Sequence, residues 1–368
     1  MSRIFTLRLL LTLLFVLTAC TGPAVNPTTT PTPVQENQAE FVLKLWTHDY
    51  LSYNNALKDK WIPEFEALHP GVKVEYTIIP YSGSIISFDS KLLADVSSGG
   101  GPDVWAMASH NFTQAGYIDS GLLAPLDLEA FGYDSVDDIV KDYPAHSLDV
   151  FIRDGKIYAL LNELTTLCLF YNKTMFDNEG IPYLPEDKPV SWEKIGEISQ
   201  SLLKTDVESG EITQMGYQFG FFANYPAPEW YIQDFYPIMR QYGQDDLFVN
   251  GKPAANSVAM INAFQKFYDF TYTYQAYDPY FVKDWFSDFS ENRVAMVTAG
   301  PWYPSVIQTI DPDIDFGVVP HPVVNPDDPI TYQNIVYSFG WVVNANSDLE
   351  HQKLAQEFLV YILGKKGE

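Results

Sequence analysis

Residues 289–319, FSENRVAMVTAGPWYPSVIQTIDPDIDFGVV, contain the pattern from which the fold class can be argued. The apolar run 294–297 predicts a short buried strand, which the Gly300-Pro301 step ends in a turn. A segment of helix length follows, and residues 315–319 predict a second strand. A strand, a helix and a strand in this order indicate an α/β fold.

Two bulky aromatic residues, Trp302 and Tyr303, follow the turn directly. In open α/β sheets ligands bind outside the carboxyl ends of strands, and Trp302 lies at such an end. Large aromatic side chains are nevertheless more often packed in a core than exposed to a ligand. The residues of this stretch therefore leave both interpretations of Trp302 open.

The chain from residue 41 onward alternates strands and helices. Residues 41–46 and 72–79 predict strands on either side of a helix at 53–69, and such a unit predicts a parallel strand pair. Residues 336–343 and 347–363 predict a buried strand and a helix. A long helix is predicted at 257–274, and its core-facing side is expected to consist of Met260, Ile261, Phe264, Phe267 and Tyr268.

The composition excludes several classes of partner and cofactor. The chain has 368 residues, of which 46% are hydrophobic and 19% charged, so it can bury the cores of roughly two domains. Its formal net charge of −25 argues against nucleic acid and anionic lipid as partners, since both require clusters of Lys and Arg. The Gly-rich run 99–101 lacks the other residues of a nucleotide-binding loop, and no cofactor is expected.

No metal site is expected either. The two cysteines, Cys20 and Cys168, have neither the spacing of a zinc site nor that of a disulfide framework. Cys168 lies in an apolar strand pattern and is interpreted as a small buried hydrophobic residue. Residues 311–315 alternate carboxylates but lack the glycine and the final acidic residue of a calcium loop, which favours a solvated loop.

The first forty residues are interpreted as a targeting segment and a tether. Residues 1–19 contain two arginines and a short apolar run, which predicts a signal peptide. The residues Leu17-Thr18-Ala19 before Cys20 resemble the bacterial lipobox, and this resemblance implies that Cys20 is lipidated. Residues 20–40 are rich in Pro and Thr and predict a disordered tether. The protein is therefore expected outside the cytoplasm, anchored to the cell membrane through lipid.

The order of motifs along the chain resembles the extracellular solute-binding proteins of family 1. These are the carbohydrate-binding receptors of ABC importers, with the maltodextrin-binding proteins as relatives. No single motif is decisive, but their order and spacing together are specific. The motifs are FVLKLWT at 41–47, GPDV at 101–104, GLLAPLD at 121–127, FYNK at 170–173, PVSW at 189–192, RVAM at 293–296, GPW at 300–302 and FGVVP at 316–320.

The resemblance implies a two-lobed periplasmic-binding-protein-like fold of type II. In this α/β fold, parallel-rich sheets are flanked by helices, and the ligand cleft lies between the lobes. The family topology implies a first lobe at residues 41–160, completed by 320–368, and a second lobe at residues 161–319. Family members usually continue through further helices after the one at 347–363, which indicates a shortened or incomplete C-terminus.

The resemblance also implies which residues contact the ligand. A sugar ring has apolar faces that aromatic rings can cover and a rim of hydroxyls that polar groups can bind. The expected stacking surfaces are Trp302, Tyr303, Trp230 and Tyr231. The expected rim contacts are Glu163, His110, Asn111, His48 and Asp49, and the far wall is expected to be lined by Ser338, Gly340 and Trp341. The maltodextrin-binding relatives have a charged pair where His110-Asn111 stands, so the type of sugar is left open.

The predicted function is that of a monomeric receptor without enzymatic activity. It would bind a neutral mono- or oligosaccharide and deliver it to an ABC permease in the membrane. Two alternatives stay open. The same fold could bind a polyamine, which suits the acidic charge, or the chain could be a lipid-anchored carbohydrate-active enzyme. The enzyme would need a second carboxylate placed across the scissile bond from Glu163.

Overall fold

A computed structural model describes residues 41–48, 53–80, 85–108, 113–219, 228–278, 280–281 and 285–364. For residues 85–89, 107–108, 113–115, 162, 228–233, 285–286 and 337–338, only the backbone is described. Within these ranges no helix is both long enough and apolar enough to cross a membrane.

The largest sheet in the described part of the chain has six strands. Its order is β2-β1-β3-β15-β4, and β7 also pairs with β15. The strands are β1 (Phe41–His48), β2 (Val72–Ile79), β3 (Val104–Ala108), β4 (Leu123–Ala124), β7 (Leu160–Thr166) and β15 (Val336–Asn344). The parallel pairing of β1 with β2, in register from Phe41–Val72 to His48–Ile79, confirms the predicted strand–helix–strand unit. Strand β15 is antiparallel to β3, β4 and β7.

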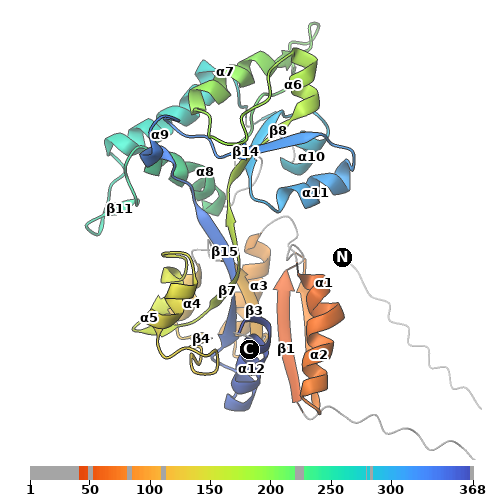
Figure 1. Ribbon diagram of the computed structural model, residues 1–368, viewed down its shortest axis with the longest axis vertical. Coiled ribbons are helices and arrows are strands. Elements are labelled where there is room, and N and C mark those ends of the chain that lie inside the picture. Colours follow the sequence, from red (N-terminus) through yellow and green to blue (C-terminus); the bar gives the residue numbers. More distant parts are fainter. Residues whose placement is uncertain are drawn as a thin grey trace, which may run out of the picture. The chain divides into compact units, whose positions relative to one another are not determined.

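Helices flank this sheet, and α2 runs beside β1 in Figure 1. The predicted helix at 53–69 is present, but a π-helical segment interrupts it, so it consists of α1 (Asn54–Ala56), η1 (Leu57–Trp61) and α2 (Ile62–Leu68). The others are α3 (Ile85–Ser97), α4 (Thr113–Asp119), α5 (Val136–Ile139), η2 (Val140–Asp142), η3 (Asp149–Phe151) and α12 (Leu349–Leu363). A short hairpin joins β5 (Ile152–Arg153) to β6 (Lys156–Ile157).

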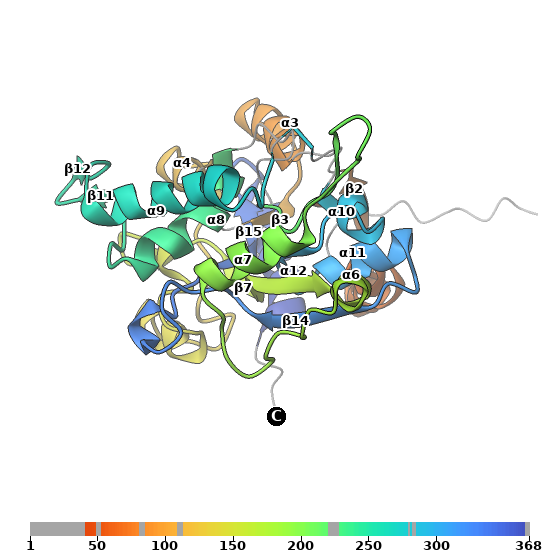
Figure 2. The same cartoon turned by 90° about the horizontal axis from the view of Figure 1, so that it is seen from above.

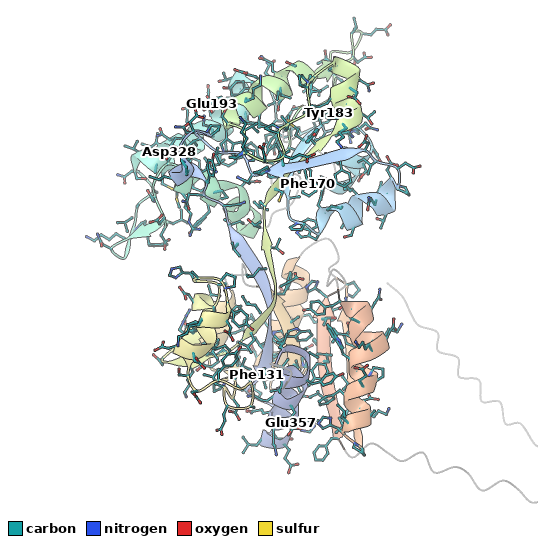
Figure 3. All side chains as sticks on the ribbon, in the orientation of Figure 1. Phe131, Phe170, Tyr183, Glu193, Asp328 and Glu357 are labelled. Carbon is teal, nitrogen blue, oxygen red and sulfur yellow. The ribbon has the colours of Figure 1, made fainter. Side chains whose placement is uncertain are left out.

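The side chains buried between this sheet and its helices form one core. Apolar residues from β1, β3 and β15 meet α2 and α12 there, and Phe65 packs edge-to-face on Phe358 with ring centroids 5.1 Å apart. Phe131, labelled in Figure 3, belongs to this core. Its buried members come from residues 43–161 and 341–359, so the end of the chain returns to the part with which the described fold begins.

A second, three-stranded sheet contains the stretch quoted first. Its order is β13 (Met296–Ala299), β8 (Cys168–Asn172) and β14 (Phe316–Pro320), with β8 antiparallel to both neighbours. The helix between β13 and β14 is α11 (Tyr303–Ile310), so the predicted strand, turn, helix and strand are all confirmed. Phe170 of β8, labelled in Figure 3, packs with Tyr303 in a core of its own.

The remaining elements surround the three-stranded sheet. The helices are α6 (Lys173–Glu179), α7 (Trp192–Leu202), α8 (Pro228–Gln241), α9 (Val258–Tyr268), η4 (Asp269–Thr273), α10 (Trp285–Ser290) and η5 (Pro329–Thr331). Two hairpins pair β9 (Lys204–Thr205) with β10 (Ile212–Gln214) and β11 (Phe248–Val249) with β12 (Lys252–Pro253). Ser191 caps α7 by accepting a hydrogen bond from the Lys194 N–H at 3.1 Å, and Trp192 is fully buried beneath it, as predicted. The predicted lobe boundaries stay a prediction.

The prediction for the helix at 257–274 is wrong on one face. Met260 and Phe267 belong to the core, together with Ala263. Ile261, Phe264 and Tyr268 are instead exposed. Both faces of this helix are therefore apolar, and a sequence pattern cannot indicate which of two apolar faces is covered.

Candidate functional site

Strand β1 ends at His48, whose backbone is held by a buried polar network. The Asn54 side-chain amide donates to the His48 carbonyl at 2.8 Å. The hydroxyls of Thr47 and Tyr76 donate to the Asn54 side-chain oxygen at 3.0 Å and 2.8 Å. The His48 ring lies 4.6 Å from the Phe339 ring of β15, centroid to centroid, and is only 2% exposed. The predicted rim residue His48 is therefore almost entirely covered.

Strand β7 brings Glu163 to the same place. Glu163 pairs with Phe339, the residue that contacts His48. The register then shifts, since Gly340 pairs with Leu161, and Asn162 is the extra residue of a β-bulge. Side chains alternate along a strand, so Glu163 and Thr165 share one face of β7.

Tyr53 lies beside this carboxylate, between two tryptophans. Its ring centroid is 5.9 Å from that of Trp61 and 6.0 Å from that of Trp341. Burial raises the pKa of Tyr53 well above its ordinary value, and the negative charge of Glu163 raises it further. His48, Tyr53, Glu163 and Phe339 thus form one cluster at the end of β1 and the middle of β7.

The turn between β13 and α11 lies directly against the same face of β7. A Cβ atom added to Gly300 would lie 2.7 Å from the Thr165 methyl group, and it would also overlap the Trp302 indole nitrogen. Only glycine leaves room for this approach without displacing a side chain. Trp302 follows Gly300 by two residues, so it lies next to β7, the strand that carries Glu163.

The two aromatic residues after this turn have different surroundings. Trp302 is half-buried, and its carbonyl accepts a hydrogen bond from the Ser305 hydroxyl at 2.7 Å. Tyr303 is 0% exposed and packs between Phe170 and Phe289, with centroids at 5.1 Å and 5.7 Å. A ring without exposed surface cannot stack on a ligand, so Tyr303 is a core residue and we do not carry it into the proposed site.

The predicted far wall also needs correction. Trp341 is 0% exposed and belongs to the core of the six-stranded sheet. A Cβ on Gly340 would lie 3.1 Å from both Ala159 Cβ and Phe151 Cζ, so Gly340 provides close packing there. Of Ser338 only the backbone is described, and it pairs with Leu164 of β7. Both residues therefore pack within the core of the six-stranded sheet, and Trp341 borders the candidate site only through the Tyr53 ring beside it.

Helix α8 is tied to β13 by a buried polar chain. The Thr298 hydroxyl donates to the Asp234 carboxylate at 2.9 Å and lies 3.1 Å from the Tyr217 hydroxyl. Burial raises the pKa of Tyr217 well above its ordinary value, and the charge of Asp234 adds to this. Trp230 precedes Asp234 by one helical turn, so the two positions share a face of α8.

Residues 50–368 match the family described as bacterial extracellular solute-binding protein. The chain belongs to this family. It is 25% identical over 319 residues to the galactooligosaccharide-binding protein of Bacillus subtilis, covering 85% of this chain and 67% of that one. It is also 23% identical over 261 residues to a putative binding protein of Brucella abortus, covering 70% of this chain but 57% of that relative, so it spans little more than half of that protein's length.

Solved structures share the fold of this solute-binding protein. A solute-binding protein of Thermotoga lettingae bound to α-D-tagatose has a TM-score of 0.66 and 19% identity, covering 86% of this chain and 76% of that one. The maltose/maltodextrin-binding domain of Bdellovibrio bacteriovorus bound to maltotriose has a TM-score of 0.65 and 21% identity, covering 87% and 76%. The predicted type II periplasmic-binding-protein fold is thereby confirmed.

Several predicted site residues lie outside the part of this solute-binding protein that the structure describes. These are Cys20, Asp49, His110 and Asn111, and of Trp230 and Tyr231 only the helical backbone is described. Among the described side chains, no group of three His, Cys, Asp or Glu residues is arranged to hold a metal ion.

The sequence interpretation missed three residues of this solute-binding protein that the structure places beside Glu163 or Gly300. Thr165 could have been found, because the period of two along a strand puts it on the face of Glu163. Tyr53 and Phe339 gave no such signal, since each is an ordinary aromatic residue at the edge of an apolar segment. The site that emerges combines a carboxylate with a half-exposed indole, a pair suited to hydroxyl groups and to the apolar face of a polyol.

Proposed function

We propose that the chain is the extracytoplasmic receptor of an ABC importer and binds a neutral mono- or oligosaccharide. The ligand would lie between β7 and the start of α11, with one sugar face on Trp302 and hydroxyl groups on Glu163. It would be released unchanged to a permease in the membrane, so the protein would not be an enzyme.

The close contact between Gly300 and Thr165 is the observation that carries this proposal. It brings a half-buried indole and a carboxylate to one face of β7, although 139 positions separate them in the sequence, from 163 to 302. An indole covers the C–H face of a sugar, and a carboxylate accepts strong hydrogen bonds from its hydroxyls. The names of the relatives agree with this chemistry, since they describe binding of galactooligosaccharide, maltotriose and tagatose.

The other parts of the proposal rest on the sequence. Trp230, Tyr231, His110, Asn111 and Asp49 are proposed as further contacts around the same ligand. Cys20 is proposed as the lipid attachment site that holds the monomer at the membrane. The two lobes are proposed at the boundaries given above, with the ligand between them.

Calorimetric titration tests the binding. Galacto-, malto- and manno-oligosaccharides are titrated into the wild type, Trp302→Ala and Glu163→Gln, with Glu208→Gln as a control carboxylate in an exposed loop. We expect at least one sugar to bind, with affinity reduced about tenfold or more in both site variants, since a hydrogen bond to a charged group contributes about 1.5–3 kcal/mol. Unchanged affinity in both site variants would place the ligand elsewhere.

The alternatives give different results in the same series. Binding of spermidine with no response to any sugar would favour a polyamine receptor, which the net charge of −25 makes the strongest alternative ligand class. Release of reducing sugar from an added oligosaccharide would favour an enzyme. Both outcomes are read from the purified wild-type protein.

A further inference from the structure

Thr165 lies between the two side chains on which the proposed binding site rests. It stands two residues after Glu163 on the same face of β7, which is about 7 Å along the strand. The Thr165 methyl carbon and Trp302 Nε1 lie 2.7 Å and 2.4 Å from one point, the position of the Cβ atom that Gly300 lacks. The two atoms are therefore at most 5.1 Å apart, which is the sum of these two distances.

The Thr165 side chain is held in place through its methyl group. This group faces Gly300, which has no side chain to displace it, and a β-branched residue has few alternative rotamers. Helix α11, which begins directly after Trp302, packs beside α10 (Figure 2). Both sides of the contact thus belong to supported elements, so the Thr165 hydroxyl has a defined position beside the indole.

The Thr165 hydroxyl differs from that of its neighbour. Thr166 donates to the Ile335 carbonyl at 2.9 Å and so ties two segments of the chain together. Thr165 is 8% exposed, and within the part of the chain that the structure describes its hydroxyl makes no hydrogen bond. A nearly buried hydroxyl is costly to leave without a partner, and most such groups have one. The partner of Thr165 therefore has to come from another molecule.

We propose that Thr165 is a specificity-determining residue of the sugar site, and that its hydroxyl binds a ligand hydroxyl next to the one bound by Glu163. This inference rests on the proposed function and deepens it. The sugar unit that stacks on Trp302 would turn an edge with two neighbouring free hydroxyls toward β7. The ligand class is thereby narrowed to sugars whose bound unit carries no branch or substituent on that edge.

The same chemistry separates a sugar from a polyamine at this position. A hydroxyl both donates and accepts hydrogen bonds, whereas an ammonium group only donates them. An ammonium group could therefore pair with the Glu163 carboxylate, but it would leave the Thr165 O–H without an acceptor. A diol satisfies both residues, so Thr165 adds a preference for hydroxyl groups that a carboxylate alone does not provide.

Two substitutions of Thr165 separate ligand binding from packing. Thr165→Val keeps a methyl group against Gly300 and removes the hydroxyl, whereas Thr165→Ser keeps the hydroxyl and removes the methyl group. Both are measured by calorimetry with galacto-, malto- and manno-oligosaccharides and by denaturant unfolding, with Thr205→Val in the exposed strand β9 as the matched control. We expect Thr165→Val to bind about three- to tenfold more weakly with unchanged unfolding. Thr165→Ser should bind within about twofold of the wild type but unfold at a lower denaturant concentration.

Monodeoxy derivatives of the sugar that binds the wild type identify the hydroxyl concerned. At one position, deoxygenation should weaken binding to the wild type about three- to tenfold and weaken binding to Thr165→Val much less, because its partner is already absent. Equal losses in the two proteins at every position would overturn the inference. Parallel losses of affinity and stability in Thr165→Val and Thr165→Ser would also overturn it, because they would show a packing role.

The inference and the proposed function can fail separately. Wild-type affinity in Thr165→Val, together with weak binding in Trp302→Ala and Glu163→Gln, would overturn the inference and leave the proposed function standing. No response of the wild type to any of the three sugars would overturn both.

Discussion

At two places in the sequence a glycine stands one or two residues before a tryptophan, and the two tryptophans differ in how far they are buried. In β15, Gly340 makes room for Ala159 and Phe151, and the adjacent Trp341 is fully buried. In the turn after β13, Gly300 makes room for the indole of Trp302 itself and for the Thr165 methyl, and Trp302 stays half-buried.

The difference lies in the backbone around each pair. Helices cover the sheet face to which Trp341 points, so a tryptophan on this strand enters a core. A turn at the end of a strand packs against the sheet on one side, and its other side can face solvent. Glycine and tryptophan thus serve core packing in β15, whereas after β13 they form part of the candidate binding site.

Truncation of the two tryptophans is the strongest test of this comparison. Trp341→Ala should lower the free energy of unfolding by about 4 kcal/mol, because it leaves a large cavity in the core. Trp302→Ala should lower it by only about 1 kcal/mol, because the ring is partly exposed. Chemical denaturation followed by far-UV circular dichroism measures both. Equal losses of stability in the two variants would contradict the comparison.

A pH series tests whether the buried surroundings of Trp192 keep a neighbouring histidine uncharged. His321 packs edge-to-face on the buried Trp192 with centroids 5.4 Å apart, and burial lowers the pKa of His321 to about 4. An unfolded histidine has a pKa near 6.5, so this group favours the folded state fully above about pH 6.5. The contribution is lost as pH falls toward 4 and amounts to as much as ~3 kcal/mol.

The variant His321→Gln removes this one titration and leaves every carboxylate in place. Its free energy of unfolding should fall less steeply than that of the wild type between pH 6.5 and 4. The measurement is denaturant unfolding at several pH values. Parallel pH profiles for the two proteins would mean that His321 has the same pKa in the folded and unfolded states, which contradicts its burial.

Adding one methyl group to each glycine sharpens the comparison with a smaller effect. Gly340→Ala should destabilise the fold by about 1–2 kcal/mol, since the new methyl meets close-packed core atoms. Gly300→Ala should displace the Trp302 indole, which can move toward solvent at little cost. We therefore expect a small change in melting temperature for Gly300→Ala but several-fold weaker sugar binding. Weaker binding in Gly340→Ala with full affinity in Gly300→Ala would reverse the assignment.

The elements of the fold could be predicted where a pattern and its end signals agree. The run 294–297, the Gly300-Pro301 step and the strand at 315–319 correspond to β13, the turn and β14. The parallel β1–β2 pair followed from one helix between two apolar segments. In each case periodicity and turn residues are local properties, which the sequence contains directly.

The site could be predicted only in part, because exposure depends on residues that are distant in the sequence. Trp302 and Tyr303 are neighbours, yet the packing of Phe170 and Phe289 buries only the second completely. Helix α9 has apolar residues on both faces, so its pattern could not indicate that Phe264 and Tyr268 face outward. The contact between Gly300 and Thr165 joins two segments that no local signal connects.

The bulge at Asn162 determines which changes in the length of β7 the candidate site would tolerate. Leu161 pairs with Gly340 and Glu163 with Phe339, so the bulge absorbs Asn162 and keeps Leu161 and Glu163 on opposite faces of the strand. Loss of this single codon would therefore leave Glu163 opposite Phe339 and Leu161 opposite Gly340, now in a regular ladder. A one-residue deletion in β7 outside the bulge would instead exchange the two faces of the strand beyond it, so this position tolerates a change of length that its neighbours do not.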